Sequence, residues 1–143
     1  MTNLTLLIPA KNEKDSLPVV LEEIKKLDCK IKVILEKDDL ETINSIKEFK
    51  CEIVYQKGKG YGDALILGIN SVDTQFFCIF NADGSFDPKE LDAMKLKLVE
   101  TKSNFIFASR YEKNSGSDDD TFVTLIGNYF FSYLCKILFN IKI

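Results

Sequence analysis

The sequence contains no histidine, and its four cysteines include no Cys-x-x-Cys pair. The absence of histidine excludes Ser-His and Cys-His catalysis and the usual mixed zinc sites. Any bound metal should therefore have oxygen ligands, which indicates Mg or Mn. Three of the cysteines lie at or inside apolar runs, where thiols usually act as small hydrophobic groups. We expect core thiols at Cys29, Cys51, Cys78 and Cys135.

An excess of positive charge is also lacking. The chain has 19 Lys and Arg against 22 Asp and Glu, a net charge of -3. Sequence-independent binding of nucleic acid depends on clustered cations, so we expect no nucleic-acid partner. The N-terminus has no basic flank, and its apolar run stops at Pro9, too short for a signal peptide or a membrane span. These absences predict a cytoplasmic protein.

The length of 143 residues, with 45% hydrophobic residues, suits one compact domain over residues 1–143. Short apolar runs alternate with segments whose apolar residues recur at helical spacing. This alternation predicts an α/β fold with a mostly parallel sheet flanked by helices. The apolar stretch from residue 122 to the end predicts a buried or interface helix, with contact to a membrane surface as the alternative. The expected strands are 4–8, 31–35, 51–55, 76–80 and 104–108, and the expected helices are 16–27, 40–49, one from about 64, and one near Pro88.

Polar clusters follow three of these strands, at Pro9 to Glu13, Glu36 to Asp39 and Asn81 to Asp87. In a parallel sheet all three lie at one edge, beside the glycine-rich loop of residues 57–62 and Arg110. Carboxylates bind a divalent cation, while amides and cationic side chains bind phosphates. This convergence suits a nucleotide diphosphate held through a divalent metal.

Asp83 is the first candidate for a metal ligand, Asp87 is the second, and Asn81 offers only an amide oxygen. The alternative is that residues 81–84 merely form a turn and that Asp87 caps the helix near Pro88.

The other candidates also have plain structural alternatives. The loop Lys57, Gly58, Lys59 and Gly60 is neither a P-loop nor a Rossmann fingerprint, and alone it is weak support for phosphate contact. Glu36, Asp38 and Asp39 suit either a base or ribose contact or a solvated helix start. Arg110 suits a phosphate contact or an ordinary exposed side chain.

Taken together, the ordered motifs resemble family 2 glycosyltransferases of the GT-A fold, in the branch of dolichyl-phosphate mannosyltransferases and polyprenyl-phosphate sugar transferases. Asn81 departs from the family's D-A-D-G, whose first acid it replaces. Residues 7–13 match the family's opening strand and its P-A-x-N-E turn, and Lys57 to Gly60 with Ala64 and Gly68 match its glycine-rich segment. Residues 81–84, with Asp87 and Pro88, lie where the family has D-A-D-G and a following D-P. Residues 109–111 match its S-R-Y strand end, and Gly127 with Asn128 resembles the start of the helix that follows.

The resemblance implies a Rossmann-like GT-A fold that binds a nucleotide-diphosphate sugar. Asp83 would ligate Mg or Mn, which stabilises charge on the leaving nucleotide, and Arg110 would face the phosphates. Asp83 and Arg110 are thus the implied catalytic residues. The implied donor-binding residues are Pro9, Ala10, Asn12, Glu13, Glu36, Asp39, Lys57, Gly58, Lys59, Gly60, Asn81 and Ala82.

By the same resemblance, the reaction is transfer of a hexose from a nucleotide sugar to a polyprenyl-phosphate lipid, which would place the enzyme peripherally at the inner membrane face. In the family an acidic, Gly-Phe segment should begin just after Ile143. We therefore expect a truncated chain with the donor half and an incomplete acceptor half, whose exposed apolar surface favours a homo-oligomer.

Two other functions stay open. The first is a non-catalytic nucleotide-sugar-binding or interaction module. The second is a nucleotidyltransferase, although its glycine-rich loop belongs directly after the first strand, where this chain has residues 9–12.

Overall fold

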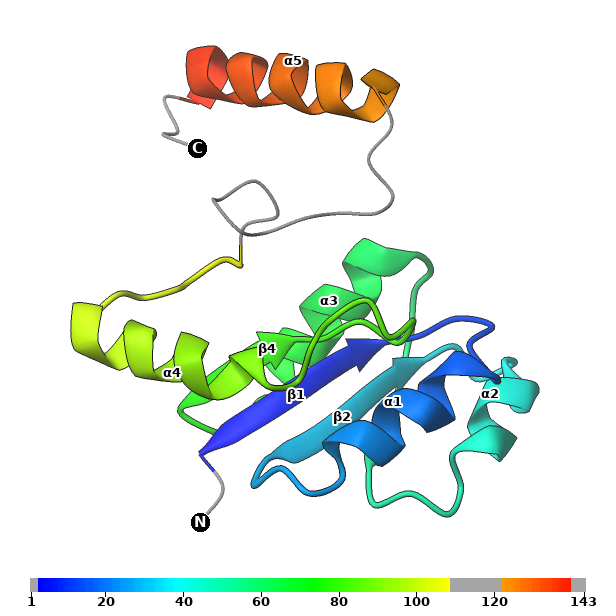
Figure 1. The fold of residues 1–143 in the computed structure, drawn as a ribbon. Helices are drawn as coiled ribbons and strands as arrows, with labels where there is room; N and C mark the ends of the chain where they lie inside the picture. The colour runs from blue at the N-terminus through cyan, green and yellow to red at the C-terminus, as the bar shows by residue number, and fades with distance from the viewer. Residues whose placement is uncertain (1–2, 109–121, 140–143) are drawn as a thin grey trace. The chain divides into compact units, whose positions relative to one another are not determined.

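The computed structural model describes residues 3–108 and 122–139 (Figure 1). The chain forms two compact units, residues 1–95 and 96–143. One domain over residues 1–143 stays a prediction.

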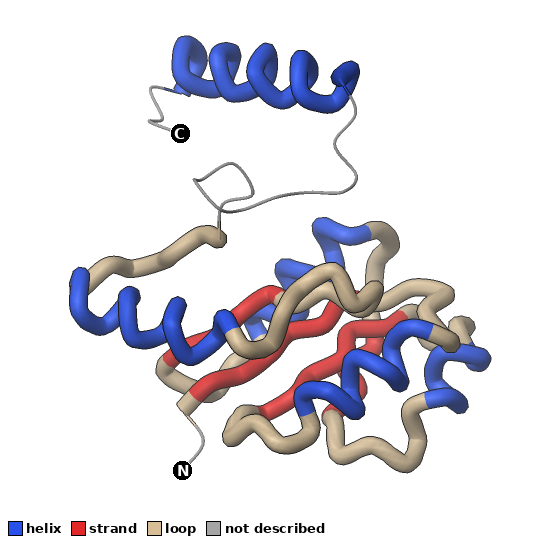
Figure 2. The backbone as a smooth tube through the Cα atoms, in the orientation of Figure 1, coloured by secondary structure: helices blue, strands red, loops and turns tan. Residues whose placement is uncertain are grey.

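The first unit is built on a parallel sheet of four strands (Figure 2). The strands are β1 (Leu4–Pro9), β2 (Lys30–Leu35), β3 (Glu52–Tyr55) and β4 (Phe76–Ile79), in the order β3-β2-β1-β4. Every pairing is parallel. The α/β class with a parallel sheet flanked by helices is therefore confirmed.

Helices cover both faces of this sheet (Figure 1). One face packs against α1 (Ser16–Ile24) and the segment after α2 (Leu40–Ser45), while the other packs against α3 (Tyr61–Asn70). Both α1 and α2 are shorter than the helical spacing predicted. The outer ends of the predicted helices, 25–27 and 46–49, form turns instead.

The alternation of side chains along β1 and β2 divides the core between the two faces. Leu6 and Ile8 of β1 join the cluster with α1, whereas Leu7 joins the cluster with α3. The α3 face is tightly packed at Gly68, where an added Cβ would lie 3.1 Å from Cδ1 of Ile34. Both faces of these strands are buried, which is why their sequences are mostly apolar; the exceptions are Thr5, Lys30 and Lys32.

Cys29, Cys51 and Cys78 are half-buried and pack against the larger core cluster, as predicted. Burial raises the pKa of all three thiols, that of Cys29 to about 11 with a smaller effect from the charge of Asp28. Cys135 is also a free thiol, but it lies in the second unit, where the described residues include no buried hydrophobic core.

The prediction of a fifth strand at residues 104–108 is wrong. These residues form no regular secondary structure and pair with no strand of the described chain, and Phe105 and Phe107 are exposed. Their apolar run contains residues with high β propensity, but a strand is stable only when its backbone groups pair and its side chains pack. The local sequence therefore indicated β propensity, but in the described part of the chain these residues have no partner strand with which to form a sheet.

The second unit contains the C-terminal half of α4 (Glu90–Thr101) and all of α5 (Phe122–Phe139). The predicted helix in the apolar C-terminal stretch is thus present. Several of its large apolar side chains are exposed, namely those of Tyr129, Phe130, Phe131, Tyr133, Ile137 and Leu138. Among the helices of the described residues, none combines the length and apolarity needed to cross a bilayer.

Candidate functional site

A cleft of about 440 Å³ lies at the carboxyl edge of the sheet. Residues that follow all four strands line it, which is the convergence that the sequence predicts. The lining residues are Pro9, Ala10, Lys11 and Glu13 from β1 and its loop, Glu36 after β2, Gln56, Gly60, Tyr61 and Ala64 after β3, and Asn81, Ala82 and Asp83 after β4.

The order of the strands explains the position of the cleft. From β1 the chain adds β2 and β3 on one side, and then returns through α3 to add β4 on the other side of β1. The connecting helices change faces at the same point, because α1 and α3 pack on opposite faces. In open α/β sheets, loops diverge at such a switch point and leave a crevice beyond the carboxyl ends of the strands. The cleft occupies this position.

Backbone hydrogen bonds continue the sheet beyond the strand ends and fix the cleft walls. The N–H of Ala10 donates to the carbonyl of Ile34 at 3.0 Å, and the N–H of Phe80 donates to Leu7 at 2.8 Å. The N–H of Gln56 likewise donates to the carbonyl of Leu35 at 2.8 Å. The first residue of each of these loops therefore has the rigidity of the sheet, which suits a preformed binding site.

Lys11 and Glu36 form an ion pair in the cleft wall, between the loops after β1 and β2. Nζ of Lys11 lies 2.8 Å from Oε1 of Glu36, and the Glu36 side chain is only 15% exposed. The hydrogen bond to Glu36 and its negative charge raise the pKa of Lys11. The carboxylate of Glu36 is thus presented to the cleft with a cation beside it.

Glu13 is held by both its backbone and its side chain. Its N–H donates to Oγ1 of Thr42 at 3.0 Å, and the hydroxyl of Ser16 donates to its carboxylate. Thr42 belongs to α2, so this contact joins the loop after β1 to the helix after β2. Glu13 lines the cleft as the sequence predicted.

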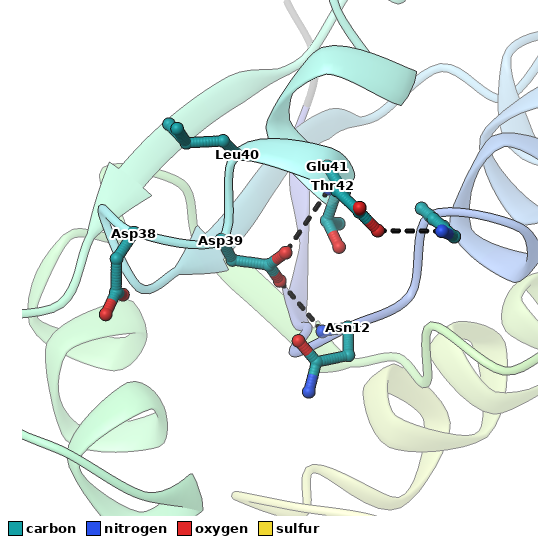
Figure 3. A pocket seen from close by; sticks show the side chains of 7 residues that line it. Asn12, Asp38, Asp39, Leu40, Glu41 and Thr42 are labelled. Carbon is teal, nitrogen blue, oxygen red and sulfur yellow. Dashed lines mark hydrogen bonds and ion pairs between the residues drawn. The ribbon is translucent and has the colours of Figure 1, made fainter.

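Asp39 and Asn12 lie at a second, smaller pocket of about 380 Å³ (Figure 3). Oδ1 of Asp39 accepts the N–H of Thr42 at 3.3 Å, and Oδ2 accepts the N–H of Asn12 at 2.8 Å. Asn12 has a positive φ of 58°, which asparagine tolerates better than most residues. Asp39 therefore caps α2 and braces the loop after β1, as the helix-start alternative predicted.

The loop after β4 is ordered by its own polar side chains. Nδ2 of Asn81 donates to Oγ of Ser85 at 2.9 Å, and the N–H of Ser85 donates to Oδ1 of Asp83 at 2.9 Å. Residues 81–84 thus form the turn, and this turn places Asn81 and Asp83 in the cleft lining, so the turn and a ligand role are compatible. Asp87 does not line the cleft; its Oδ1 accepts the N–H of Lys89 in the turn before α4.

In the glycine-rich loop, only Gly60 among the four predicted residues lines the cleft. Lys57, Gly58 and Lys59 are exposed outside its lining. The N–H of Gly58 donates to Oδ2 of Asp63 at 3.1 Å. This backbone N–H therefore already has a carboxylate of the chain as its acceptor.

Eight predicted site residues are therefore brought together in the cleft: Pro9, Ala10, Glu13, Glu36, Gly60, Asn81, Ala82 and Asp83. Arg110 lies outside the described residues. The sequence analysis missed Lys11, Gln56, Tyr61 and Ala64 as lining residues. A signal for Gln56 was present, since it directly follows β3 just as Glu36 follows β2.

The donor atoms of the cleft fit a hard divalent cation only in part. No group of three or more Asp, Glu, Cys or His side chains that could hold a metal occurs in the described residues. Mg²⁺, however, is commonly bound by one or two carboxylates together with substrate phosphates. The Asp83 carboxylate and the Asn81 amide oxygen suit that mode of binding.

Comparison with known proteins assigns the family. The sequence profile of glycosyl transferase family 2 matches residues 5–142. Similar curated proteins are uncharacterized glycosyltransferases of Mycobacterium bovis and Mycobacterium tuberculosis, 28% identical over 94 residues. The match covers 66% of this chain and 43% of each relative, so the chain spans less than half of their length. Because the profile covers nearly the whole sequence, the chain belongs to glycosyl transferase family 2.

Proposed function

We propose that the chain binds a nucleotide-diphosphate sugar in the cleft and transfers its hexose to a polyprenyl-phosphate lipid. The observation that carries the proposal is the convergence of polar residues from all four strand ends on one cleft. Family membership supports glycosyl transfer in general. The exposed aromatic side chains of α5 support an apolar acceptor, since such a surface is suited to contact with lipid.

The charges in the cleft support a metal-assisted site. Glu13, Glu36 and Asp83 bring three carboxylates to the lining, against the single ammonium of Lys11 among the described lining residues. A diphosphate would be repelled by this balance unless a cation accompanied it. Asp83, with the Asn81 oxygen, would hold Mg or Mn, and the bound metal would supply Lewis-acid stabilisation of the phosphates.

Equilibrium titration of the native chain with UDP-, GDP-, ADP- and CDP-sugars, with and without Mn²⁺, tests donor binding. We expect one of them to bind more tightly with Mn²⁺, and Asp83→Asn to remove that metal-dependent gain. Asp92→Asn removes the same charge from the exposed first turn of α4 and serves as the matched control. The donor-site assignment fails if no nucleotide sugar binds, or if the two variants behave alike.

A nucleotide-sugar-binding module without transfer is the second candidate. It is favoured by the single carboxylate in the turn of residues 81–84, where Asn81 provides no charge. Incubation with the bound donor, radiolabelled in its sugar, and a polyprenyl phosphate separates the two functions. Label in the lipid fraction supports the transferase, whereas donor binding without labelled lipid supports the module.

A further inference from the structure

Gln56 is the first residue after β3, and its side-chain amide is held in one orientation within the cleft wall. Nε2 lies 3.0 Å from the carbonyl oxygen of Gly60 and 3.3 Å from Oδ2 of Asp63. A primary amide has two N–H donors and one acceptor oxygen. Both N–H groups of Gln56 are therefore directed at acceptors of its own loop.

The reverse orientation of this amide is excluded because it would bring three hydrogen-bond acceptors together. Rotation by half a turn would place Oε1 against a carbonyl oxygen and a carboxylate, which are acceptors only. Asp63 is itself fixed, because its Oδ2 also accepts the N–H of Gly58 at 3.1 Å. A side chain at Gly58 would displace this carboxylate, since an added Cβ would lie 2.5 Å from Oδ1 of Asp63. The loop thus determines which end of the Gln56 amide is available.

Oε1 is the polar atom of Gln56 that this arrangement leaves for a ligand. Over residues 3–108 and 122–139, no group donates a hydrogen bond to it. Gln56 is half-buried and lines the cleft, where a polar atom without a partner is costly once ligand displaces water. A ligand that fills the cleft beside Gln56 should therefore bring a hydrogen-bond donor.

We propose that Gln56 is a specificity-determining residue, whose Oε1 accepts a hydrogen bond from an N–H or O–H group of the bound nucleoside. The inference rests on the proposed function, because it takes a nucleotide as the ligand of the cleft. Asp63 acts as a positioning residue, since it prevents the amide from rotating. On this basis the loop after β3 recognises its ligand through a neutral amide, in addition to any contact made by its lysines.

The test compares UDP and GDP with analogues that lack one donor, using calorimetric titration in Mg²⁺. For the tighter ligand, the analogues are the N-methylated base (N3-methyl-UDP or N1-methyl-GDP) and the 2′-deoxynucleotide. We expect Gln56→Met, which keeps the side-chain length, to weaken binding of the parent nucleotide about tenfold. One analogue should bind the native protein more weakly by the same factor, and Gln56→Met should no longer distinguish it from the parent. Which analogue does so identifies the base or the ribose as the donor.

Two further variants isolate the role of the amide. Gln75→Met makes the same change at an exposed position at the opposite end of β4, and should bind every nucleotide as the native protein does. Asp63→Ala removes one of the two acceptors that orient the Gln56 amide and leaves only the Gly60 carbonyl, so the parent and the discriminated analogue should bind with more similar affinities. Circular dichroism checks that each variant is folded.

Different results overturn the two proposals. Unchanged binding by Gln56→Met, or an equal loss for both analogues in the native protein and Gln56→Met, overturns the role of Gln56 and leaves the proposed function intact. If the native protein binds neither UDP nor GDP while another nucleotide sugar binds, the nucleotide of that sugar and its own analogues take their place in the same comparison, and the same results support or overturn the role of Gln56. If no nucleotide binds at all, the proposed function fails and the role of Gln56 fails with it.

Discussion

Lys11, two residues beyond the end of β1, pairs with Glu36, the first residue after β2, with Nζ 2.8 Å from Oε1. The lysine side chain is 61% exposed, whereas that of Glu36 is 15% exposed. An ion pair with one solvated partner contributes little to folding. The pair therefore does more to orient the Glu36 carboxylate in the cleft than to stabilise the fold.

We accordingly expect Glu36→Gln to weaken binding of the nucleotide sugar about tenfold, because a hydroxyl bonds a carboxylate more strongly than an amide. The midpoint of urea unfolding should change little. Glu41→Gln is the matched control, since Glu41 pairs with Lys14 at 2.7 Å outside the cleft. Calorimetric titration of both variants measures the effect, and equal affinities for the two would contradict the assigned role of Glu36.

The sequence identifies Asp39 as a polar residue at a strand end, but its hydrogen bonds to the N–H groups of Asn12 and Thr42 are seen only in the structure. We expect Asp39→Ala to lower the free energy of unfolding by about 1–2 kcal/mol, because the α2 cap and the Asn12 N–H lose their acceptor. Asp38→Ala removes the neighbouring exposed carboxylate and should change stability by less than about 0.5 kcal/mol. Urea denaturation of the two variants checks this, and similar unfolding midpoints would argue against the capping role.

The strands and the edge that bears the cleft could be predicted because both follow from hydrophobic pattern. Residues 4–8, 31–35 and 76–80 are apolar runs that end in polar clusters, and parallel pairing brings those ends together. Residues 104–108 have a similar pattern, but strand formation depends on a pairing partner that the local sequence does not specify.

In the loops at the carboxyl edge of the sheet, the sequence predicts the residue types at each strand end but not which of them form hydrogen bonds to one another. Asp39 bonds to backbone groups, the Gly58 amide bonds to Asp63, and Gln56 is fixed by its own loop. These contacts depend on the positions of a few loop atoms, which a hydrophobic pattern does not encode.

The packing of α3 on the sheet gives a prediction about two of its glycines. We expect Gly68→Val to lower the free energy of unfolding by about 1–3 kcal/mol, because its side chain would press against Ile34 and Leu7. Gly62→Ala in the same helix has open space around its Cβ, and should raise stability by about 0.5–1 kcal/mol through helix propensity. Thermal unfolding of both variants measures the difference. A neutral Gly68→Val would show that α3 does not pack on the sheet at this position.

The half-buried thiols give a prediction about pH. Burial raises the pKa of Cys29 from 9.0 to about 11, so the folded state holds its proton more tightly than the unfolded chain does. The resulting contribution to stability is complete below pH 9 and is lost as the pH rises to about 11. Stability should therefore fall across this interval, and Cys29→Ser should show a smaller fall.

Thiol reactivity measures the same shift directly, because the thiolate is the form that reacts. At pH 8 the thiolate fraction of Cys29 should be about a hundredfold lower in the folded protein than in urea, since each pKa unit changes that fraction about tenfold. We expect iodoacetamide to alkylate the Cys29 peptide slowly in the native protein and rapidly in urea, as followed by peptide mass spectrometry. Cys51 and Cys78, whose thiol pKa burial also raises, should be protected in the same direction. Equal alkylation rates in the folded and unfolded states would show that these thiols are not held against the core.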